Sequence, residues 1–280
     1  MRVTVIEDAK HAVAAQPGHL ASDAPEHRAK AAIYPSLRGR RVIITGGASG
    51  IGEGIVDGFV AQGAAVAFID IHADNAQRVM ERHAEAEIAP ICRLQNIIDC
   101  EGLTATLHTL MADLGGCDVL VNNAGNDDRH TVAEVTPAYW DERIAVNLKH
   151  KFFAAQAVAP AMRAVGGGVI LNLGSISWHL GLEDLTVYQT AKAGVEGLTR
   201  SLARELGPGG IRVNTIVPGN VQTPRQMQWY TPESEAEIVA AQCIKGRLQP
   251  SDIAAMAMFL ASDDARYCTA QSYWVDGGWR

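Results

Sequence analysis

The 280-residue sequence lacks the long apolar run of ~18 residues that a membrane-spanning helix needs. Its five cysteines are odd in number and none stand in a C-x-x-C spacing, so neither a disulfide framework nor a zinc site is predicted. Basic residues are fewer than acidic ones, with 24 Lys and Arg against 31 Asp and Glu, and the sequence contains no extended run of basic residues. This charge pattern argues against binding to nucleic acid. We therefore expect a cytoplasmic protein with no membrane or nucleic-acid partner.

The first 36 residues differ in composition from the rest of the chain. The stretch from Ala12 to Ala32 is rich in alanine, contains Pro17 and Pro25, and lacks the apolar segment of a signal peptide. We expect residues 1–36 to form a loosely ordered N-terminal extension, with packing across a subunit contact as the alternative. No comparable change of composition follows, so residues 37–280 are expected to form one domain.

Strand-like and helix-like segments alternate from residue 41 onward. Strands are predicted at 41–45, 65–70, 90–95, 117–121, 168–173, 211–216 and 272–275. Helices are predicted at 50–62, 74–87, 101–114, 137–163, 187–206 and 251–261. Residues 219–245 form a variable segment, in which residues 226–230 are expected to close over substrate. This alternation predicts an α/β fold, a doubly wound parallel seven-stranded sheet in a single domain. Ligands of such sheets bind beyond the carboxyl ends of the strands.

A glycine-rich turn follows the first predicted strand, in the segment Thr45-Gly-Gly-Ala-Ser-Gly-Ile-Gly52. Strand, glycines and helix together can bind the pyrophosphate of a dinucleotide, because glycines allow close backbone approach and a helix N-terminus favours negative charge. An ordinary strand-to-helix turn is the alternative interpretation. The candidate cofactor-binding residues of this turn are Gly46, Ser49, Gly50, Ile51 and Gly52.

Asp70 ends the second predicted strand, where an acidic side chain would accept the adenosine ribose hydroxyls of a dinucleotide. A carboxylate at this position also repels a 2′-phosphate, and neither Gly47 nor Ile71 supplies a compensating positive charge. The sequence therefore predicts NAD rather than NADP as the cofactor.

Ser175, Tyr188 and Lys192 are the candidate catalytic side chains. Ser175 follows the predicted strand 168–173, and Tyr188 and Lys192 are four residues apart, so they share one face of a helix. An ammonium near a phenol favours the phenolate and lowers a pKa that is normally ~10. Such a set can remove a proton from an alcohol while a cofactor takes a hydride.

These motifs occur in order with Asn122-Asn-Ala-Gly125, Asn147 and Pro218-Gly219. Through them the chain resembles the short-chain dehydrogenases/reductases from about residue 36 to its end. The segments 126–130, 174–184 and 276–280 are similar to those of bacterial members that oxidise the aldopentose D-xylose at C1 to its lactone with NAD. The resemblance implies a Rossmann fold and a small-molecule sugar substrate. An NAD-dependent dehydrogenase of another aldose, such as L-arabinose, is the alternative.

The resemblance also implies roles for further residues. Asn147 would hold a water that links Lys192 to solvent and completes a proton relay, and Lys192 would also hold the nicotinamide ribose. Beyond the glycine turn and Asp70, the implied cofactor contacts are Asn96, Ile97, Asn123, Gly125, Tyr188, Lys192, Pro218, Gly219 and Val221. The expected substrate contacts are polar groups around the same crevice, Asn126, His130, Ser175, Trp178, His179, Tyr188 and Asn220, with a lid or core position as the alternative for Trp178.

Three other functions are weighed against this interpretation. Ser175, His179 and Asp184 could mimic a hydrolase triad, but the sequence around Ser175 is not Gly-x-Ser-x-Gly. A non-catalytic NAD-binding module would be expected to lose Tyr188, Lys192 or Asn147, and all three are present. The loop from Asp127 to His130 could suggest a metal cluster, but this chemistry leaves a metal no task, so no metal is predicted.

Association with further copies of the chain is also expected. The helices that begin near Pro137 and Tyr188 carry more apolar side chains than one sheet face can cover, which predicts a closed homo-oligomer, a tetramer. The candidate contact residues are Val158, Met162, Val195, Leu198 and Leu202, together with the tail from Trp274 to Arg280.

Overall fold

The structure, a computed structural model, describes residues 32–279. The expectation for the N-terminal extension falls mostly on residues 1–31 and lies outside the described residues. Residues 32–36 contact the end of the first long helix: the Tyr34 backbone N–H donates to the Gln62 side-chain oxygen at 2.8 Å, and the Gln62 amide donates to the Ala32 carbonyl at 2.8 Å. A short 3₁₀ helix, Pro35–Leu37, leads into the first strand.

A parallel sheet of seven strands forms the centre of the described chain, in the order β3-β2-β1-β4-β5-β6-β7. Its strands are β1 (Arg41–Thr45), β2 (Ala65–Asp70), β3 (Ile91–Leu94), β4 (Val119–Asn122), β5 (Gly168–Leu173), β6 (Ile211–Pro218) and β7 (Ser272–Val275). The chain starts in the middle at β1, winds outward to β3, and returns beside β1 at β4. This reversal of direction confirms the doubly wound α/β prediction and creates a crevice at the carboxyl ends of β1 and β4.

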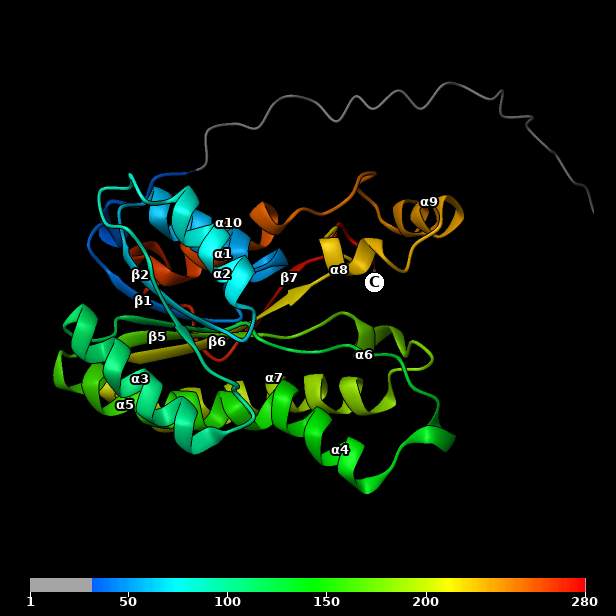
Figure 1. Ribbon diagram of the computed structural model, residues 1–280, viewed down its shortest axis with the longest axis horizontal. Helices are drawn as coiled ribbons and strands as arrows, with labels where there is room; N and C mark the ends of the chain where they lie inside the picture. Colours follow the sequence, from blue (N-terminus) through cyan, green and yellow to red (C-terminus); the bar gives the residue numbers. More distant parts are fainter. Residues whose placement is uncertain (1–31, 280) are drawn as a thin grey trace, which may run out of the picture. The chain divides into compact units, whose positions relative to one another are not determined.

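Helices cover both faces of the sheet (Figure 1). On one face lie α1 (Gly50–Ala61), α2 (Ala73–Arg82) and α10 (Pro250–Ala261), and on the other α3 (Cys100–Leu114), α5 (His150–Ala164) and α7 (Thr186–Leu206). Each face has its own apolar core, one centred on Phe59 and Phe68 and the other on Leu107 and Leu120. Strands buried on both faces explain why the predicted strands are nearly continuous apolar runs.

Local contacts mark the ends of two of these helices. In α3 the Asp99 side chain accepts from the Gly102 backbone N–H, and Gly115 ends the helix in the left-handed conformation at φ 77°. The helix α2 ends at Arg82, before the predicted 87, where the His83 ring contacts Asp57 of α1 at 2.6 Å.

The predicted helix at 137–163 is three segments in the structure. The α-helix α4 (Pro137–Ile144) passes into a π-helical turn, Ala145–Lys149, and then into α5. A π turn inserts a residue into the helical repeat and rotates the side chains that follow, and such turns are frequent at functional sites. Asn147 lies at the centre of this turn.

Four of the residues predicted to form a subunit contact lie in the core of the chain itself. Val158, Met162 and Val195 have no exposed surface, and Leu202 is 7% exposed. Val158, Met162 and Leu202 pack against the sheet in one of the two apolar cores. The apolar spacing of these helices therefore reflects burial within the chain and not contact with another subunit. This part of the sequence prediction was wrong.

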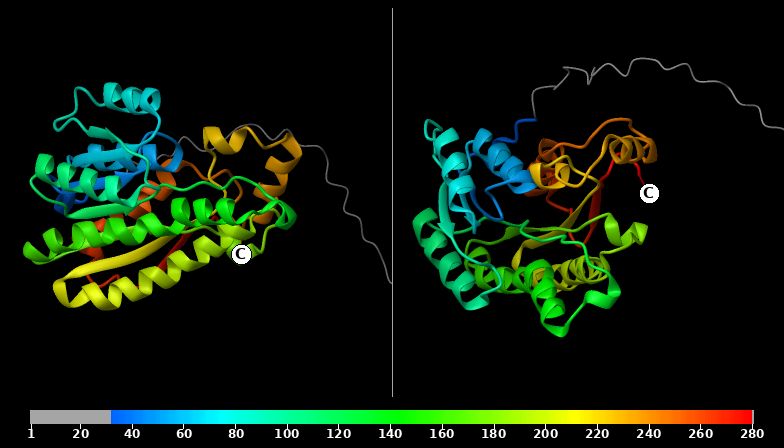
Figure 2. Two further views of the ribbon diagram at one scale, coloured as in Figure 1. Left: turned by 60° about the horizontal axis from the view of Figure 1, so that its bottom comes forward. Right: turned by 45° about the vertical axis from the view of Figure 1, so that its right-hand side comes forward.

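The segment beyond β6 folds into two helices that the sequence did not predict, α8 (Pro224–Met227) and α9 (Pro232–Ala241). They lie beyond the carboxyl ends of the strands, across from α4 and the short helix α6 (Ser177–Leu180) (Figures 1 and 2). No helix among residues 32–279 is both long enough and apolar enough to cross a membrane.

Candidate active site

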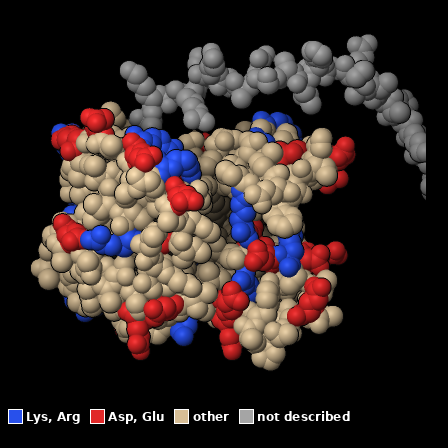
Figure 3. Space-filling model, viewed as in Figure 1, with Lys and Arg blue, Asp and Glu red and all other residues tan. Residues whose placement is uncertain are grey.

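A cavity of about 550 Å³ opens at the carboxyl end of the sheet. The space-filling view shows the hollow, with charged side chains along its rim (Figure 3). Most of the residues predicted from the sequence line it: Gly46, Ser49, Gly50, Ile51, Gly52, Asp70, Asn96, Ile97, Asn123, Gly125, Asn126, Ser175, Tyr188, Lys192, Pro218, Gly219, Asn220 and Val221. Four predicted residues, Asn147, His130, Trp178 and His179, do not line it.

The glycine turn between β1 and α1 leaves room for a ligand against the backbone. Gly46 and Gly50 have φ values of 69° and 55°, a conformation that glycine adopts without strain. A Cβ on Gly52 would lie 1.8 Å from the Gly46 carbonyl oxygen, so no larger residue fits this turn. The Asn123 amide donates to the same oxygen at 2.8 Å. The turn therefore presents the N-terminus of α1 to the cavity as a dinucleotide pyrophosphate requires.

Asp70 lies at the end of β2 with its carboxylate almost fully buried. One oxygen accepts from the Ala48 backbone N–H at 2.9 Å and the other from the Ile71 N–H at 2.8 Å. Asp70 thus fixes the glycine turn as well as facing the cavity. No Lys or Arg among residues 32–279 makes an ion pair with it.

Asn96 follows β3 and faces the same part of the cavity. Its side-chain oxygen accepts from the Ile98 backbone N–H at 3.1 Å, and this bond shapes the loop after the strand. The neighbouring Ile97 is buried and contributes an apolar wall.

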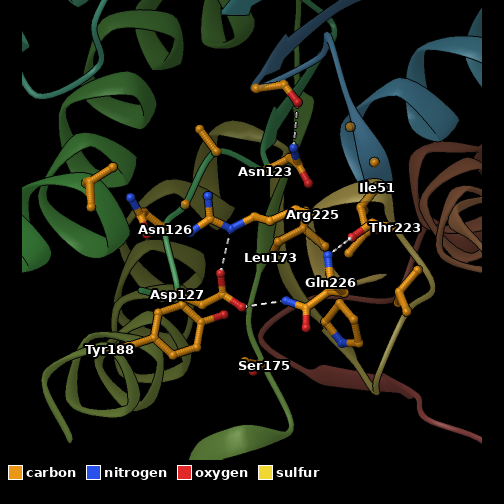
Figure 4. Close-up of a pocket in the computed structure, with 18 of the residues that line it drawn as sticks. Ile51, Asn123, Asn126, Asp127, Leu173, Ser175, Tyr188, Thr223, Arg225 and Gln226 are labelled. Atoms are coloured by element: carbon orange, nitrogen blue, oxygen red, sulfur yellow. Dashed lines mark hydrogen bonds and ion pairs between the residues drawn. The ribbon is translucent and has the colours of Figure 1, made fainter. Parts of the chain in front are cut away.

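Ser175, Tyr188 and Lys192 line the same part of the cavity, and Figure 4 shows Ser175 and Tyr188 there. The Lys192 ammonium is buried, donates to the Leu173 carbonyl at 2.9 Å, and lies 5.4 Å from the centre of the Tyr188 ring. The Ser175 hydroxyl donates to the Ser177 hydroxyl at 2.9 Å. These contacts bring the predicted catalytic hydroxyl, phenol and ammonium to one place.

The electrostatics of Tyr188 differ from the sequence expectation. Burial raises the pKa of its phenol above the usual 10, the charge of Asp127 raises it further, and the hydrogen bond from Ser175 together with Arg225 and Arg129 lowers it. The Lys192 side-chain nitrogen lies over the face of the ring and donates to a carbonyl rather than to the phenol oxygen. Burial also lowers the pKa of Lys192 to about 8, which Asp127 partly offsets.

Asn147 braces the loop after β4. It is fully buried; its side-chain oxygen accepts from the Asn126 N–H at 2.9 Å, and its amide donates to the Asn126 carbonyl at 2.9 Å. The glycine between this side chain and Lys192 is required, since a Cβ on Gly125 would lie 2.9 Å from the Asn147 oxygen and 3.5 Å from the Lys192 nitrogen.

His130 was predicted to contact substrate, and the structure places it in the protein interior. Its Nδ1 lies 3.0 Å from the Tyr139 hydroxyl, and its Nε2 accepts from the Val187 backbone N–H at 3.2 Å. His130 therefore joins the loop after β4 to α4 through Nδ1 and to the start of α7 through Nε2.

Trp178 and His179 also turn away from the cavity. The Trp178 indole N–H donates to Glu196 at 3.0 Å, and His179 Nε2 lies 2.9 Å from the same carboxylate oxygen. Their rings stack on each other at 3.6 Å, and His179 contacts Trp274 of β7. The cluster ties α6 and α7 to β7, so we no longer expect these side chains to recognise substrate.

Arg225 of α8 was not predicted from the sequence, and Gln226 was expected to close over substrate but was not among the predicted site residues. Both side chains reach across the cavity to Asp127, which also lines it (Figure 4). The Thr223-Pro224 pair is a helix-start signal that could have located α8, because the Thr223 hydroxyl caps it. No group of three or more potential metal ligands occurs among residues 32–279.

The comparisons with known proteins agree with this geometry. A family profile described as "Enoyl-(Acyl carrier protein) reductase" matches residues 46–280. The chain is 60% identical to the D-xylose 1-dehydrogenase of Caulobacter vibrioides over 250 residues, which cover 89% of this chain and 99% of that protein. It is 45% identical to a Rhizobium meliloti protein named "Probable galactose dehydrogenase GalD", with 88% of this chain and 96% of that protein covered.

Two solved structures with bound nicotinamide cofactors have a similar fold at lower sequence identity. A 7α-hydroxysteroid dehydrogenase in complex with NADH and 7-oxo glycochenodeoxycholic acid aligns with a TM-score of 0.84 and 34% identity, covering 87% of this chain and 96% of that one. A blue fluorescent protein from a metagenomic library, in complex with NADPH, aligns with a TM-score of 0.81 and 32% identity, covering 87% and 99%.

Proposed function

The chain belongs to the short-chain dehydrogenase/reductase family of oxidoreductases, and from this premise we propose that it oxidises D-xylose at C1 to its lactone with NAD. The observation that supports this most is the 60% identity to a D-xylose 1-dehydrogenase along nearly its whole length. The cavity adds a physical reason, because Ser175, Tyr188 and Lys192 meet where a ligand hydroxyl can reach them.

The residues at the cavity fit a nicotinamide dinucleotide. The glycine turn would hold the pyrophosphate, Asp70 the adenosine ribose, and Asn96 with Ile97 the adenine. The nicotinamide half would lie against Asn123, Gly125 and the segment Pro218–Val221, with Tyr188 and Lys192 beside its ribose. NAD is favoured over NADP because Asp70 presents an uncompensated carboxylate. When bound, the cofactor supplies the acceptor for the hydride that leaves C1.

Side chains of the protein would accept the proton and orient the sugar. Tyr188 takes the proton of the C1 hydroxyl, and Ser175 donates a hydrogen bond to the same oxygen. As the C1–H bond breaks, the oxygen forms a carbonyl, and the product is the lactone. Because burial raises the pKa of Tyr188, its base role needs the Ser175 bond and nearby positive charge.

Lys192 and Asn147 would assist this step through their contacts with Tyr188 and with the loop after β4. Lys192 holds its ammonium beside the Tyr188 ring, and Asn147 keeps the Gly125–Asn126 backbone within reach of it. We propose that a water near Asn147 and Lys192 passes the proton to solvent. The substrate contacts that remain proposed are Asn126 and Asn220, which line the cavity with the catalytic residues.

A dehydrogenase of another aldose is the second candidate, favoured by the 45% identity to the galactose dehydrogenase relative. The test compares D-xylose, L-arabinose, D-galactose, D-glucose and a secondary alcohol with NAD and with NADP, followed by the absorbance of the reduced cofactor. We expect D-xylose with NAD to give the highest kcat/KM. A higher kcat/KM for another aldose would change the sugar assignment, and a higher one for the non-sugar alcohol would overturn the proposal.

A further inference from the structure

The helix α8 is joined to the loop after β4 by one arginine. Arg225 Nε lies 3.0 Å from an Asp127 carboxylate oxygen, and its Nη2 donates to the Asn126 side-chain oxygen at 3.0 Å. The same guanidinium pairs with Asp128. The three acceptors are consecutive in sequence, so Arg225 alone bonds three successive residues of the loop.

Gln226 completes the contact from the next position of α8. Its amide donates to the second Asp127 oxygen at 2.6 Å, and its own oxygen accepts from the Tyr230 hydroxyl at 2.6 Å. Tyr230 in turn accepts from Asn220 at 2.6 Å. Both oxygens of Asp127 are therefore held by α8, and the chain of bonds continues to the loop after β6. We name Asp127, Arg225 and Gln226 the latch.

The latch closes directly over the candidate base. Figure 4 shows the Asp127 carboxylate between Tyr188 on one side and Arg225 and Gln226 on the other. A carboxylate at this position disfavours a phenolate, and a guanidinium bound to that carboxylate counteracts it. After burial, Asp127 is the foremost influence that raises the pKa of Tyr188, while Ser175, Arg225 and Arg129 lower it.

We propose that Arg225 is a positioning residue for the reaction, which closes α8 on Asp127 and offsets the negative charge of that carboxylate beside the Tyr188 hydroxyl. Closure over the substrate and preparation of the base are then one event. With α8 open, Asp127 would face Tyr188 without its partner and the phenol would keep its proton. This inference rests on the proposed role of Tyr188 as the base.

A purely structural role makes a different prediction. The Arg225 side chain is 48% exposed and that of Asp127 is 28% exposed, and ion pairs this accessible contribute little to folding stability. Loss of a merely structural contact would change thermal stability slightly, or would lower turnover equally at every pH. The proposed role instead changes the pH at which turnover rises.

The experiment compares Arg225→Gln and Asp127→Asn by the pH profile of kcat, with saturating D-xylose and NAD. At neutral pH we expect Arg225→Gln to lower kcat about three- to tenfold and to recover it at alkaline pH, because the phenol loses a nearby positive charge. In Arg225→Gln, the pH at which kcat rises should therefore be higher than in the wild type. In Asp127→Asn, the pH at which kcat rises should be lower than in the wild type. Arg225→Lys, which keeps the charge, should restore most of the wild-type profile.

Arg93→Gln is the matched control, since Arg93 is 49% exposed and pairs with Asp113 on a distant edge of the sheet. Its profile should coincide with that of the wild type. Two variants that shift the pH at which kcat rises in the same direction, or that leave it unchanged, would overturn the inference. Because wild-type oxidation of D-xylose and the loss of activity in Tyr188→Phe are measured beside them, failure of the latch is distinguishable from failure of the proposed function.

Discussion

At the scale of single residues, the phenol of Tyr188 makes the sharpest prediction. Replacing it with Phe keeps the ring beside Lys192 but removes the group that would take the proton. We expect turnover to fall by ~10²–10⁴-fold. Binding of NAD, followed by calorimetry, should change little, because the glycine turn and Asp70 are far along the cavity. A variant that kept more than about a tenth of the wild-type turnover would contradict the assignment.

A second prediction at this scale concerns Asp70. Its carboxylate both faces the cavity and binds the Ala48 backbone N–H. The wild type should prefer NAD over NADP by at least ~10²-fold in kcat/KM, because a like-charge contact with a 2′-phosphate costs several kcal/mol. Asp70→Ala should narrow this preference mainly by weakening NAD, since the glycine turn also loses a support. Equal use of both cofactors by the wild type would refute the argument.

The predicted residues that the structure brings to one cavity include those whose position follows from local spacing. Three glycines follow β1, and Tyr188 lies one turn before Lys192 on α7. His130 and Trp178 were misplaced because the direction of a loop side chain depends on distant partners. His130 accepts from the Val187 backbone N–H, and Trp178 donates to Glu196. The sequence around His130 or Trp178 does not identify these partners.

At the scale of elements, the π turn from Ala145 to Lys149 shows where periodicity is insufficient. The apolar spacing of 137–163 predicts one continuous helix, and one inserted residue leaves no compositional trace. The turn nevertheless directs Asn147 to the loop after β4. The pattern of residue types predicted the helix, but the direction of the Asn147 side chain became known only from the backbone of the structure.

The start of α5 yields a prediction about stability. Lys151 is fully buried, and its side-chain nitrogen donates to the Asn122 carbonyl at 2.6 Å. Burial, and then the charge of Lys192, hold the pKa of Lys151 well below its usual 10.5. The unfolded chain therefore binds a proton that the folded chain disfavours, so stability should rise with pH between the lowered pKa and 10.5.

Lys151→Met should raise the melting temperature at neutral pH, and the gain should shrink as the pH approaches the usual lysine pKa. Lys149→Met, at an exposed position of the π turn, is the matched control and should show no such pH-dependent gain. Thermal unfolding at several pH values measures both. A Lys151→Met protein that melts lower at neutral pH would show that the buried amine stabilises the fold.

At the scale of the whole molecule, the sheet followed from the alternation of strands and helices. Parallel strands need crossovers, and crossovers of one hand leave few possible orders. The segment 219–245 was not predicted in the same way, because α8 and α9 are short and are positioned by contacts such as Arg225 with Asp127 rather than by an apolar stripe.

Assembly is the last property at this scale, and we expect a closed homotetramer. With four of the predicted contact residues buried, the large aromatic side chains that α4 and α5 leave exposed are Trp140 and Phe152, each 41% exposed. Large exposed aromatic side chains are enriched where proteins associate. Light scattering at micromolar concentration should give about four times the chain mass of 29.9 kDa.

Phe152→Glu places a charge on the exposed side of α5 and should lower the measured mass, because a buried unpaired charge opposes association. Val132→Glu is the control, since Val132 is 75% exposed in the short 3₁₀ helix before α4 and lies on neither α4 nor α5. A monomeric wild type would refute the tetramer. A Phe152→Glu protein of unchanged mass would instead show that the chain associates through another surface, and the tail from Trp274 would then be the next segment to alter.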